Sequence, residues 1–131
     1  MGAADYRETL AGRSVLLVDD EAIVVEVIRE VIGPMVSVFA SASNGIEALA
    51  RILDRDFDFI LMDIEMPRMN GIELYRHISE TKPHLLKKVI FITGDTETEV
   101  TRSFIKKSGC LYLDKPFMIK DLLSVMSRGA Y

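Results

Sequence analysis

Short runs of apolar residues recur along the chain, and each is bounded by polar residues. Five such runs lie at about 14–18, 36–40, 57–62, 88–92 and 110–113. Their length and their content of branched and aromatic side chains are typical of buried parallel β-strands. The pattern therefore predicts five strands at these positions.

Between these runs, apolar residues recur at the spacing of an amphipathic helix. The first helix should begin near Glu21 and stop at Gly33-Pro34, and the second should open near Ser43. The other three should follow the loop at 66–71, lie between 95 and 107, and cover about 119–127.

Strands that alternate with helices form parallel pairs joined by right-handed crossovers. The expected fold is an α/β, doubly wound, five-stranded parallel sheet in the order 2-1-3-4-5, flavodoxin-like, with five helices. These elements use up the chain. We therefore expect one domain over residues 1–131 (core about 14–127) and no output domain.

Composition narrows the functional classes. With 49% hydrophobic and 27% charged residues, the chain should be globular. A net charge of −4 argues against nucleic-acid binding, and there is neither a membrane-length apolar stretch nor a signal-peptide core at the N-terminus. The single cysteine, Cys110, cannot form an internal disulfide, so a cytoplasmic location is expected and packing is its expected role.

Polar residues stand at or just beyond the ends of four predicted strands. Asp19 and Asp20 follow the first, Asp63 the third, Thr93 the fourth, and Lys115 comes shortly after the fifth. In an open α/β sheet the carboxyl ends of the strands meet at one edge, where ligands bind. Three carboxylates, a hydroxyl and an ammonium at one edge suit Mg²⁺ and a phosphoryl group.

Each of these residues also has an ordinary structural interpretation. Asp20 could cap a helix, Asp63 and Thr93 could begin turns, and Lys115 could be solvated. Their joint placement favours the site, because two adjacent carboxylates repel without a nearby cation and a buried carboxylate is costly without one. A carboxylate so placed could act as a nucleophile and form an aspartyl-phosphate. The Lys115-Pro116 bond could be cis.

Four motifs together resemble the receiver domain of two-component response regulators over about residues 14–127. They are Val18-Asp19-Asp20-Glu21, Met62-Asp63-Ile64-Glu65-Met66-Pro67 followed by Asn70-Gly71, Thr93-Gly94, and Asp114-Lys115-Pro116-Phe117.

The resemblance implies a signalling receiver rather than an enzyme, supporting its own phosphotransfer and autodephosphorylation. Asp63 would accept a phosphoryl group from a histidine kinase or a histidine phosphotransfer protein. The implied Mg²⁺ ligands are Asp20, Asp63 and the main-chain carbonyl of Glu65, with Asp19 acting through water. Thr93 and Lys115 would bind the phosphoryl oxygens.

The resemblance also implies a conformational switch. Tyr112 would be the aromatic switch residue acting with Thr93, a buried core tyrosine being the alternative. The sequence itself indicates which surface would change. The helix between 95 and 107 has three threonines in its first half and a thin apolar stripe, chiefly Val100, Phe104 and Ile105. We therefore expect this helix to shift, together with the strand at 110–113 and the helix at 119–127. A weak dimer could form through that surface. Glu65 and Asp95 are acidic at positions that vary in the family, which leaves the lifetime of the phosphoryl group open.

Other functions stay open at this stage. One is a magnesium-dependent phosphatase with Asp63 as nucleophile, although such enzymes carry the nucleophile after the first strand of their motif. Another is a flavodoxin-like electron carrier, which the acidic first loop disfavours. Two settings of the domain also stay open: a stand-alone regulator, and the C-terminal receiver of a hybrid histidine kinase.

Overall fold

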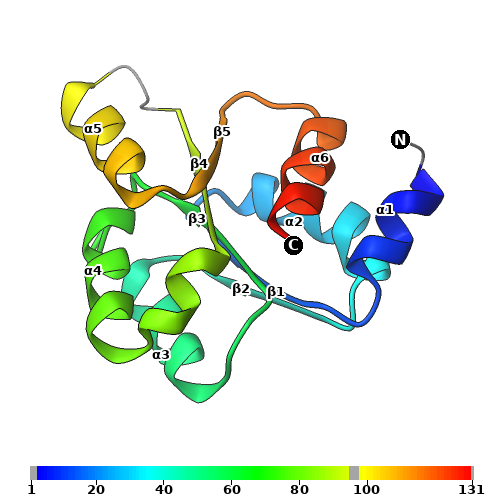
Figure 1. Cartoon of the computed structure of the whole chain (residues 1–131), viewed down its shortest axis with the longest axis horizontal. Helices are drawn as coiled ribbons and strands as arrows, with labels where there is room; N and C mark the ends of the chain where they lie inside the picture. Colours follow the sequence, from blue (N-terminus) through cyan, green and yellow to red (C-terminus); the bar gives the residue numbers. More distant parts are fainter. Residues whose placement is uncertain (1–2, 95–97, 131) are drawn as a thin grey trace.

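The computed structural model describes residues 3–94 and 98–130, and it forms three layers with a parallel sheet in the middle (Figure 1). The sheet has five strands in the order β2-β1-β3-β4-β5, which confirms the predicted topology. Their bounds are β1 (Ser14–Val18), β2 (Val38–Ala42), β3 (Phe59–Asp63), β4 (Val89–Thr93) and β5 (Leu111–Asp114).

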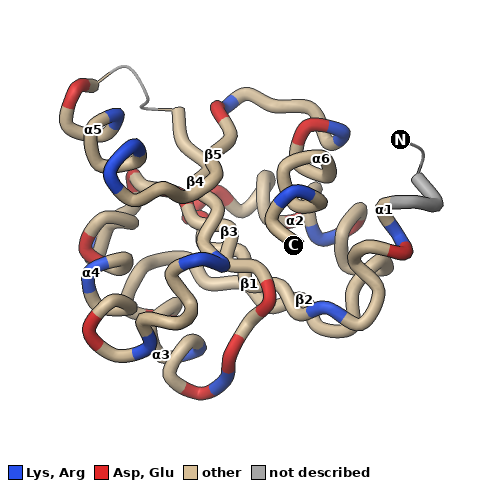
Figure 2. The backbone as a smooth tube through the Cα atoms, in the orientation of Figure 1, with Lys and Arg blue, Asp and Glu red and all other residues tan. Residues whose placement is uncertain are grey.

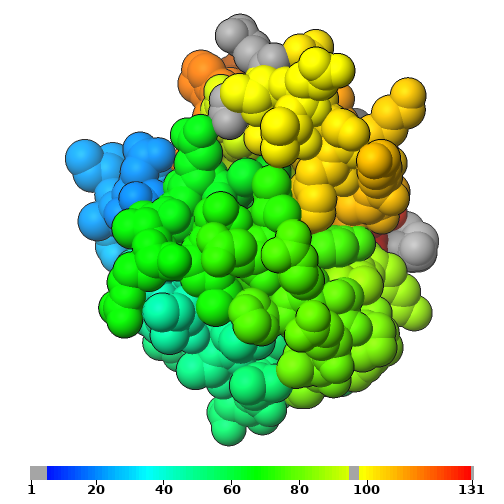
Figure 3. All heavy atoms as spheres, turned by 90° about the vertical axis from the view of Figure 1, so that its left-hand side faces the viewer, coloured from blue at the N-terminus to red at the C-terminus, as the bar shows by residue number. Residues whose placement is uncertain are grey.

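Helices cover both faces of the sheet. The described α-helices are α1 (Ala3–Leu10), α2 (Ala22–Ile32), α3 (Gly45–Asp54), α4 (Gly71–Thr81), α5 (Glu99–Ser108) and α6 (Ile119–Gly129), with short 3₁₀ helices η1 (Gly33–Met35) and η2 (Pro83–Lys88). In the space-filling view, α3, α4 and α5 form one continuous side of the molecule (Figure 3).

The alternation of side chains along each strand divides the core into two halves. Leu16, Ile60 and Phe91 pack toward α3, α4 and α5. Leu17 and Leu61, at neighbouring positions, pack toward α1, α2 and α6. Because the central strands are buried on both faces, they read in the sequence as continuous apolar runs.

Local signals set several helix ends. The side chain of Asn44 accepts a hydrogen bond from the backbone N–H of Glu47, and Asn70 forms a reciprocal capping box with Glu73. Gly109 ends α5 in a left-handed conformation with φ of 71°. The second predicted helix therefore begins at its expected position, and the fourth ends at Ser108, one residue after its predicted bound.

The structure corrects the prediction of five helices, because α1 adds a sixth α-helix among the described residues. Leu10 is completely buried, and Tyr6 packs against the core formed by α2 and α6. Eight residues with so few apolar anchors carry a weak sequence signal, and tertiary packing stabilises this helix. Strands β2 and β3 also begin two residues later than predicted, and β4 and β5 begin one residue later.

The anchoring of α5 also differs from the expected apolar stripe. Val100 is 74% exposed, whereas the neighbouring Thr101 is buried together with Ile105. Asp95 lies outside the described residues, so the start of the predicted fourth helix is not covered.

Charged positions are spread over the helices and loops, with acidic and basic residues interleaved (Figure 2). Across the described ranges, every helix is too short or too polar to cross a membrane.

We predict that Gly71→Ala destabilises the fold at the end of β3. A Cβ atom at Gly71 would lie 2.6 Å from the backbone oxygen of Asp63 and 2.8 Å from the Cα of Ile64. Because backbone atoms cannot swing aside, the free energy of unfolding should fall by about 1–3 kcal/mol. Urea denaturation measures this change.

Gly33→Ala is the matched control. Its Cβ would meet nothing closer than Arg29 Cγ at 3.8 Å, and the backbone there is helical. This variant should change stability by less than about 1 kcal/mol, in the stabilising direction. Equal stabilities of the two variants would contradict the close approach at Gly71.

Candidate functional site

Three carboxylates meet at the carboxyl ends of two adjacent strands. Asp19 and Asp20 follow β1, and Asp63 ends β3, which pairs directly with β1. Carboxylate oxygens of the three residues lie within 4.8 Å of one another. Asp19 and Asp63 are buried, whereas Asp20 is exposed. The sheet topology thus brings the predicted acidic residues together.

Lys115 reaches this cluster from the loop between β5 and α6. Its Nζ lies 3.0 Å from Asp19 Oδ2, 3.1 Å from Asp63 Oδ2 and 3.0 Å from Glu21 Oε1. Its backbone N–H donates to the carbonyl of Thr93 at 3.0 Å, and the Lys115-Pro116 peptide bond is cis. Lys115 is therefore part of the site and not a solvated surface lysine.

The backbone holds the two buried carboxylates from the other side. Asp19 Oδ1 accepts a hydrogen bond from the N–H of Glu21 at 2.9 Å, and Asp63 Oδ1 accepts one from the N–H of Glu65 at 3.2 Å. Each carboxylate is thus bound through one oxygen to the backbone and through the other to Lys115. This arrangement fixes the orientation of both side chains.

Burial dominates the electrostatics of Asp63. It raises the pKa of this carboxyl to about 6, although Lys115 acts in the opposite direction. Burial also tends to lower the pKa of Lys115, but its bonds to Asp19, Glu21 and Asp63 outweigh this and raise it above its usual value. The site therefore holds more negative charge than one ammonium can balance.

The donor set fits a hard divalent cation. Carboxylate oxygens are the ligands that Mg²⁺ prefers, and it keeps several waters. An open hollow of about 490 Å³, lined by Asp20, Glu65 and Asn70 among others, lies beside the cluster. It gives room for those waters.

Thr93 and Tyr112 are placed differently from the charged residues. Thr93 is buried at the end of β4, next to β3. Tyr112 on β5 is 49% exposed and lines a hollow of about 830 Å³ between α5 and β5. Tyr112 is therefore not a core tyrosine in this structure, and its role as a switch stays a prediction.

Glu21 is the site residue that sequence reasoning missed. It was expected only to start a helix, and the structure gives it a direct ion pair with Lys115. The available signal was its position directly after Asp19 and Asp20, at the loop that faces the end of β5.

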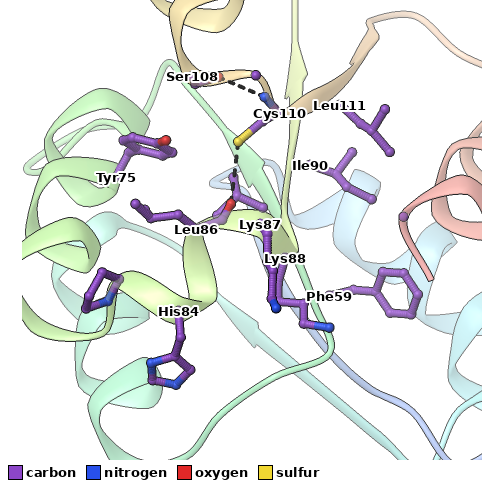
Figure 4. Close-up of a pocket in the computed structure, with 14 residues that line it drawn as sticks. Phe59, Tyr75, His84, Leu86, Lys87, Lys88, Ile90, Ser108, Cys110 and Leu111 are labelled. Carbon is purple, nitrogen blue, oxygen red and sulfur yellow. Dashed lines mark hydrogen bonds between the residues drawn. The ribbon is translucent and has the colours of Figure 1, made fainter. Parts of the chain in front are cut away.

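A second hollow, of about 490 Å³, lies at the opposite edge of the sheet, at the amino ends of β3, β4 and β5 (Figure 4). There the thiol of Cys110 donates to the carbonyl of Leu86 at 3.5 Å, and burial raises its pKa. Phe59, Ile90 and Leu111 line the same hollow. A thiol with a raised pKa beside apolar side chains favours the packing role expected for Cys110.

We predict that Asp63→Asn stabilises the metal-free protein at neutral pH. Because the pKa of Asp63 is higher in the folded protein than its ordinary 3.8, the folded state binds more protons between about pH 4 and 6. Wild-type stability should therefore fall by up to about 3 kcal/mol as pH rises through this window, and the variant should escape that loss. Urea denaturation in a chelator at pH 4 and 7.5 measures both.

Asp54→Asn, at an exposed position at the end of α3, controls for the loss of one charge. It should change stability by less than about 0.5 kcal/mol at either pH. If Asp63→Asn were less stable than wild type at pH 7.5, Lys115 would outweigh burial and the assigned direction of the shift would be wrong.

Comparisons with known proteins agree with this geometry. The family model described as "Response regulator receiver domain" matches residues 15–127. The chain is 30% identical over 115 residues to the chemotaxis protein CheY of Halobacterium salinarum, covering 88% of this chain and 94% of that protein.

Solved structures show the same fold. Chemotaxis protein CheY4 of Vibrio cholerae aligns with a TM-score of 0.79 at 26% identity, over 89% of this chain and 98% of that one. The receiver domain of the histidine kinase CKI1 from Arabidopsis thaliana, solved in complex with Mg²⁺ and BeF₃⁻, aligns with a TM-score of 0.78 at 27% identity, over 95% and 94% of the two chains. With its acidic cluster, its lysine and its sheet topology, the chain belongs to the family of response regulator receiver domains.

Proposed function

We propose that the chain is a phosphoacceptor switch in which Asp63 takes a phosphoryl group from a phosphohistidine. The observation that carries this proposal is the contact of a buried carboxylate with both an acidic neighbour and an ammonium, at 3.1 Å from Lys115 Nζ. Receiver domains are signalling modules that work with histidine kinases or phosphotransfer proteins.

The reaction would be an in-line displacement at phosphorus. A carboxylate oxygen of Asp63 forms the new P–O bond, the P–N bond to the donor imidazole breaks, and its electron pair stays on the leaving nitrogen. Lys115 offers its charge to the phosphoryl oxygens, and the hydroxyl of Thr93 is proposed as a donor to them. The same site would later support hydrolysis of the acyl phosphate.

Mg²⁺ is the proposed cofactor. Asp20, Asp63 and the main-chain carbonyl of Glu65 would hold it, with Asp19 acting through water. When bound, it supplies positive charge that neutralises the transferring group. The excess of carboxylates over cations at the site supports this role.

An apolar surface beside the site supports a protein as phosphodonor. Ile23 on α2 is 80% exposed, and Val27 on the same helix is also exposed. With Pro116 and Phe117 they line a hollow of about 500 Å³ that reaches Lys115. An exposed apolar patch next to polar chemistry is typical of a protein docking surface.

We also propose a cellular compartment for this protein and a setting for its receiver domain. Cys110 is a free thiol, which suits a reducing cytoplasm. A response regulator or a hybrid histidine kinase is the proposed setting of this receiver domain.

We predict that phosphorylation requires both Asp63 and Mg²⁺. Incubation with acetyl phosphate or with a phosphorylated histidine phosphotransfer protein should yield one acid-stable, base-labile acyl phosphate, detected by mass spectrometry. Asp63→Asn should abolish it. Asp20→Ala should weaken Mg²⁺ binding by about tenfold or more, because one charged ligand is lost.

Lys115→Ala is the companion variant. It should fold, but it should lose either phosphotransfer or the conformational change that follows phosphorylation. A labile phosphate on the Asp63→Asn protein would refute the assignment of the acceptor. An unchanged Mg²⁺ affinity in Asp20→Ala would leave Asp20 as a helix-capping residue.

We propose that the phosphoryl group shifts the surface formed by α5, β5 and α6. The helix α5 suits such a shift because only Thr101 and Ile105 are buried on it. The hollow between α5 and β5 leaves space beside Tyr112. Weak self-association, if it accompanies the switch, is proposed at this same surface.

The expected outcome is a large change in amide chemical shifts on adding beryllofluoride, a phosphoryl mimic, to the Mg²⁺-loaded protein. Shifts should extend from Thr93 to about Tyr112, because a ligand that favours one of two conformations moves the whole element. Asp63→Asn with beryllofluoride is the control and should show none. Changes confined to the neighbours of Asp63 would indicate a passive phosphate carrier.

A further inference from the structure

The ammonium of Lys115 is shared by three carboxylates of very different exposure. Its three donors match Asp19 Oδ2, Glu21 Oε1 and Asp63 Oδ2, all within 3.1 Å. The side chains of Asp19 and Asp63 are 1% and 7% exposed, whereas that of Glu21 is 60% exposed. Glu21 is thus the solvated member of a set that is otherwise buried.

Glu21 has no competing task in the local fold. It occupies the N-cap position of α2, but its side chain makes no capping hydrogen bond. Its backbone N–H holds Asp19 Oδ1, so the residue contacts the site through both its backbone and its carboxylate. It also lines the hollow that contains Ile23 and Phe117, next to the proposed docking surface.

A phosphoryl group on Asp63 would change what Lys115 can bind. It would add about one further negative charge and new acceptor oxygens beyond the carboxylate. Carboxylates already on the ammonium compete with those oxygens for its donors. Releasing Asp19 would leave a buried charge unpaired, which is costly, whereas Glu21 would return to water at little cost.

We propose that Glu21 is a positioning residue that holds Lys115 in the unphosphorylated protein and releases it when Asp63 is phosphorylated. This inference rests on the proposed phosphoacceptor function. It implies that Glu21 opposes phosphorylation, because its contact with Lys115 must be lost. It also implies that phosphorylation uncovers a negative charge at the edge of the docking surface.

The test compares Glu21→Gln, Glu21→Asp and wild type in phosphorylation by acetyl phosphate. The Mg²⁺ concentration must saturate every variant, so that a weaker metal attraction does not enter. Glu21→Gln removes the charge, and Glu21→Asp keeps it on a side chain one methylene shorter, which draws it back from Lys115. Both should be phosphorylated about two- to fivefold faster, the range expected for an exposed ion pair.

Glu26→Gln is the matched control, because Glu26 is an exposed acid of the same helix that pairs with Arg29 and not with Lys115. Its rate should equal that of wild type. The rate of phosphorylation could rise in Glu21→Gln alone, with Glu21→Asp at the wild-type rate. This would show that negative charge near the site matters and that the contact with Lys115 does not. That outcome would overturn the proposal.

A second readout follows the contact directly, without phosphotransfer. In protein labelled with ¹³C at glutamate, the carboxyl signal of Glu21 should move at constant pH when beryllofluoride binds, because its partner leaves. The signal of Glu26 should stay in place. A stationary Glu21 signal, in a protein whose Asp63 region does respond, would refute the release.

The outcomes separate the two proposals. If wild type forms no Mg²⁺-dependent acyl phosphate, or Asp63→Asn still does, the proposed function fails. If wild type is phosphorylated normally and both Glu21 variants match it, only the role of Glu21 fails.

Discussion

The burial of negative charge at the carboxyl edge of the sheet is the constraint on which the site depends. Asp19 and Asp63 are buried on neighbouring strands, and Lys115 Nζ bridges them at 3.0 and 3.1 Å. Burial nevertheless raises the pKa of Asp63 to about 6, so the ammonium does not fully offset the cost. A site in this condition attracts a further cation and stabilises a phosphoryl group in its presence, which is the chemistry we propose.

The rest of the fold supplies stability that offsets the energetic cost of burying charge at this site. Strands β1, β3 and β4 are buried along their whole length, and the two halves of the core are filled by helices on both faces. Gly71 lets α4 start directly against the backbone of Asp63, with its N–H bonded to the carbonyl of Ile64 at 2.9 Å. The acceptor carboxylate is therefore held on a rigid strand end, as precise phosphotransfer requires.

The helices next to the site are not held equally. Helix α6 buries Leu122, Leu123, Val125, Met126 and Ser127, whereas α5 buries only two residues. An aromatic cluster of Tyr75, Phe91 and Phe104, with ring centroids 5.2–5.8 Å apart, links α5 to α4 and β4. The helix proposed to move thus has fewer buried anchors than α6, and it is attached to the same strand that carries Thr93.

The sequence by itself determined the sheet and most of the charged site. Apolar runs of strand length mark β1 to β5, and the crossover rules leave one natural strand order. Polar residues directly after those runs predicted that Asp19, Asp20, Asp63 and Lys115 meet at one edge, because strand ends converge whatever the details of packing.

Only the tertiary structure decided the remaining features. The helix α1 forms because Leu10 and Tyr6 find partners on distant elements, and no local pattern records those partners. Likewise, the exposure of Val100 in place of Thr101 depends on how α5 is rotated against the sheet. The contact between Glu21 and Lys115 spans 94 residues of chain. Such a pair depends on side-chain placement across two loops, which periodicity and spacing do not encode.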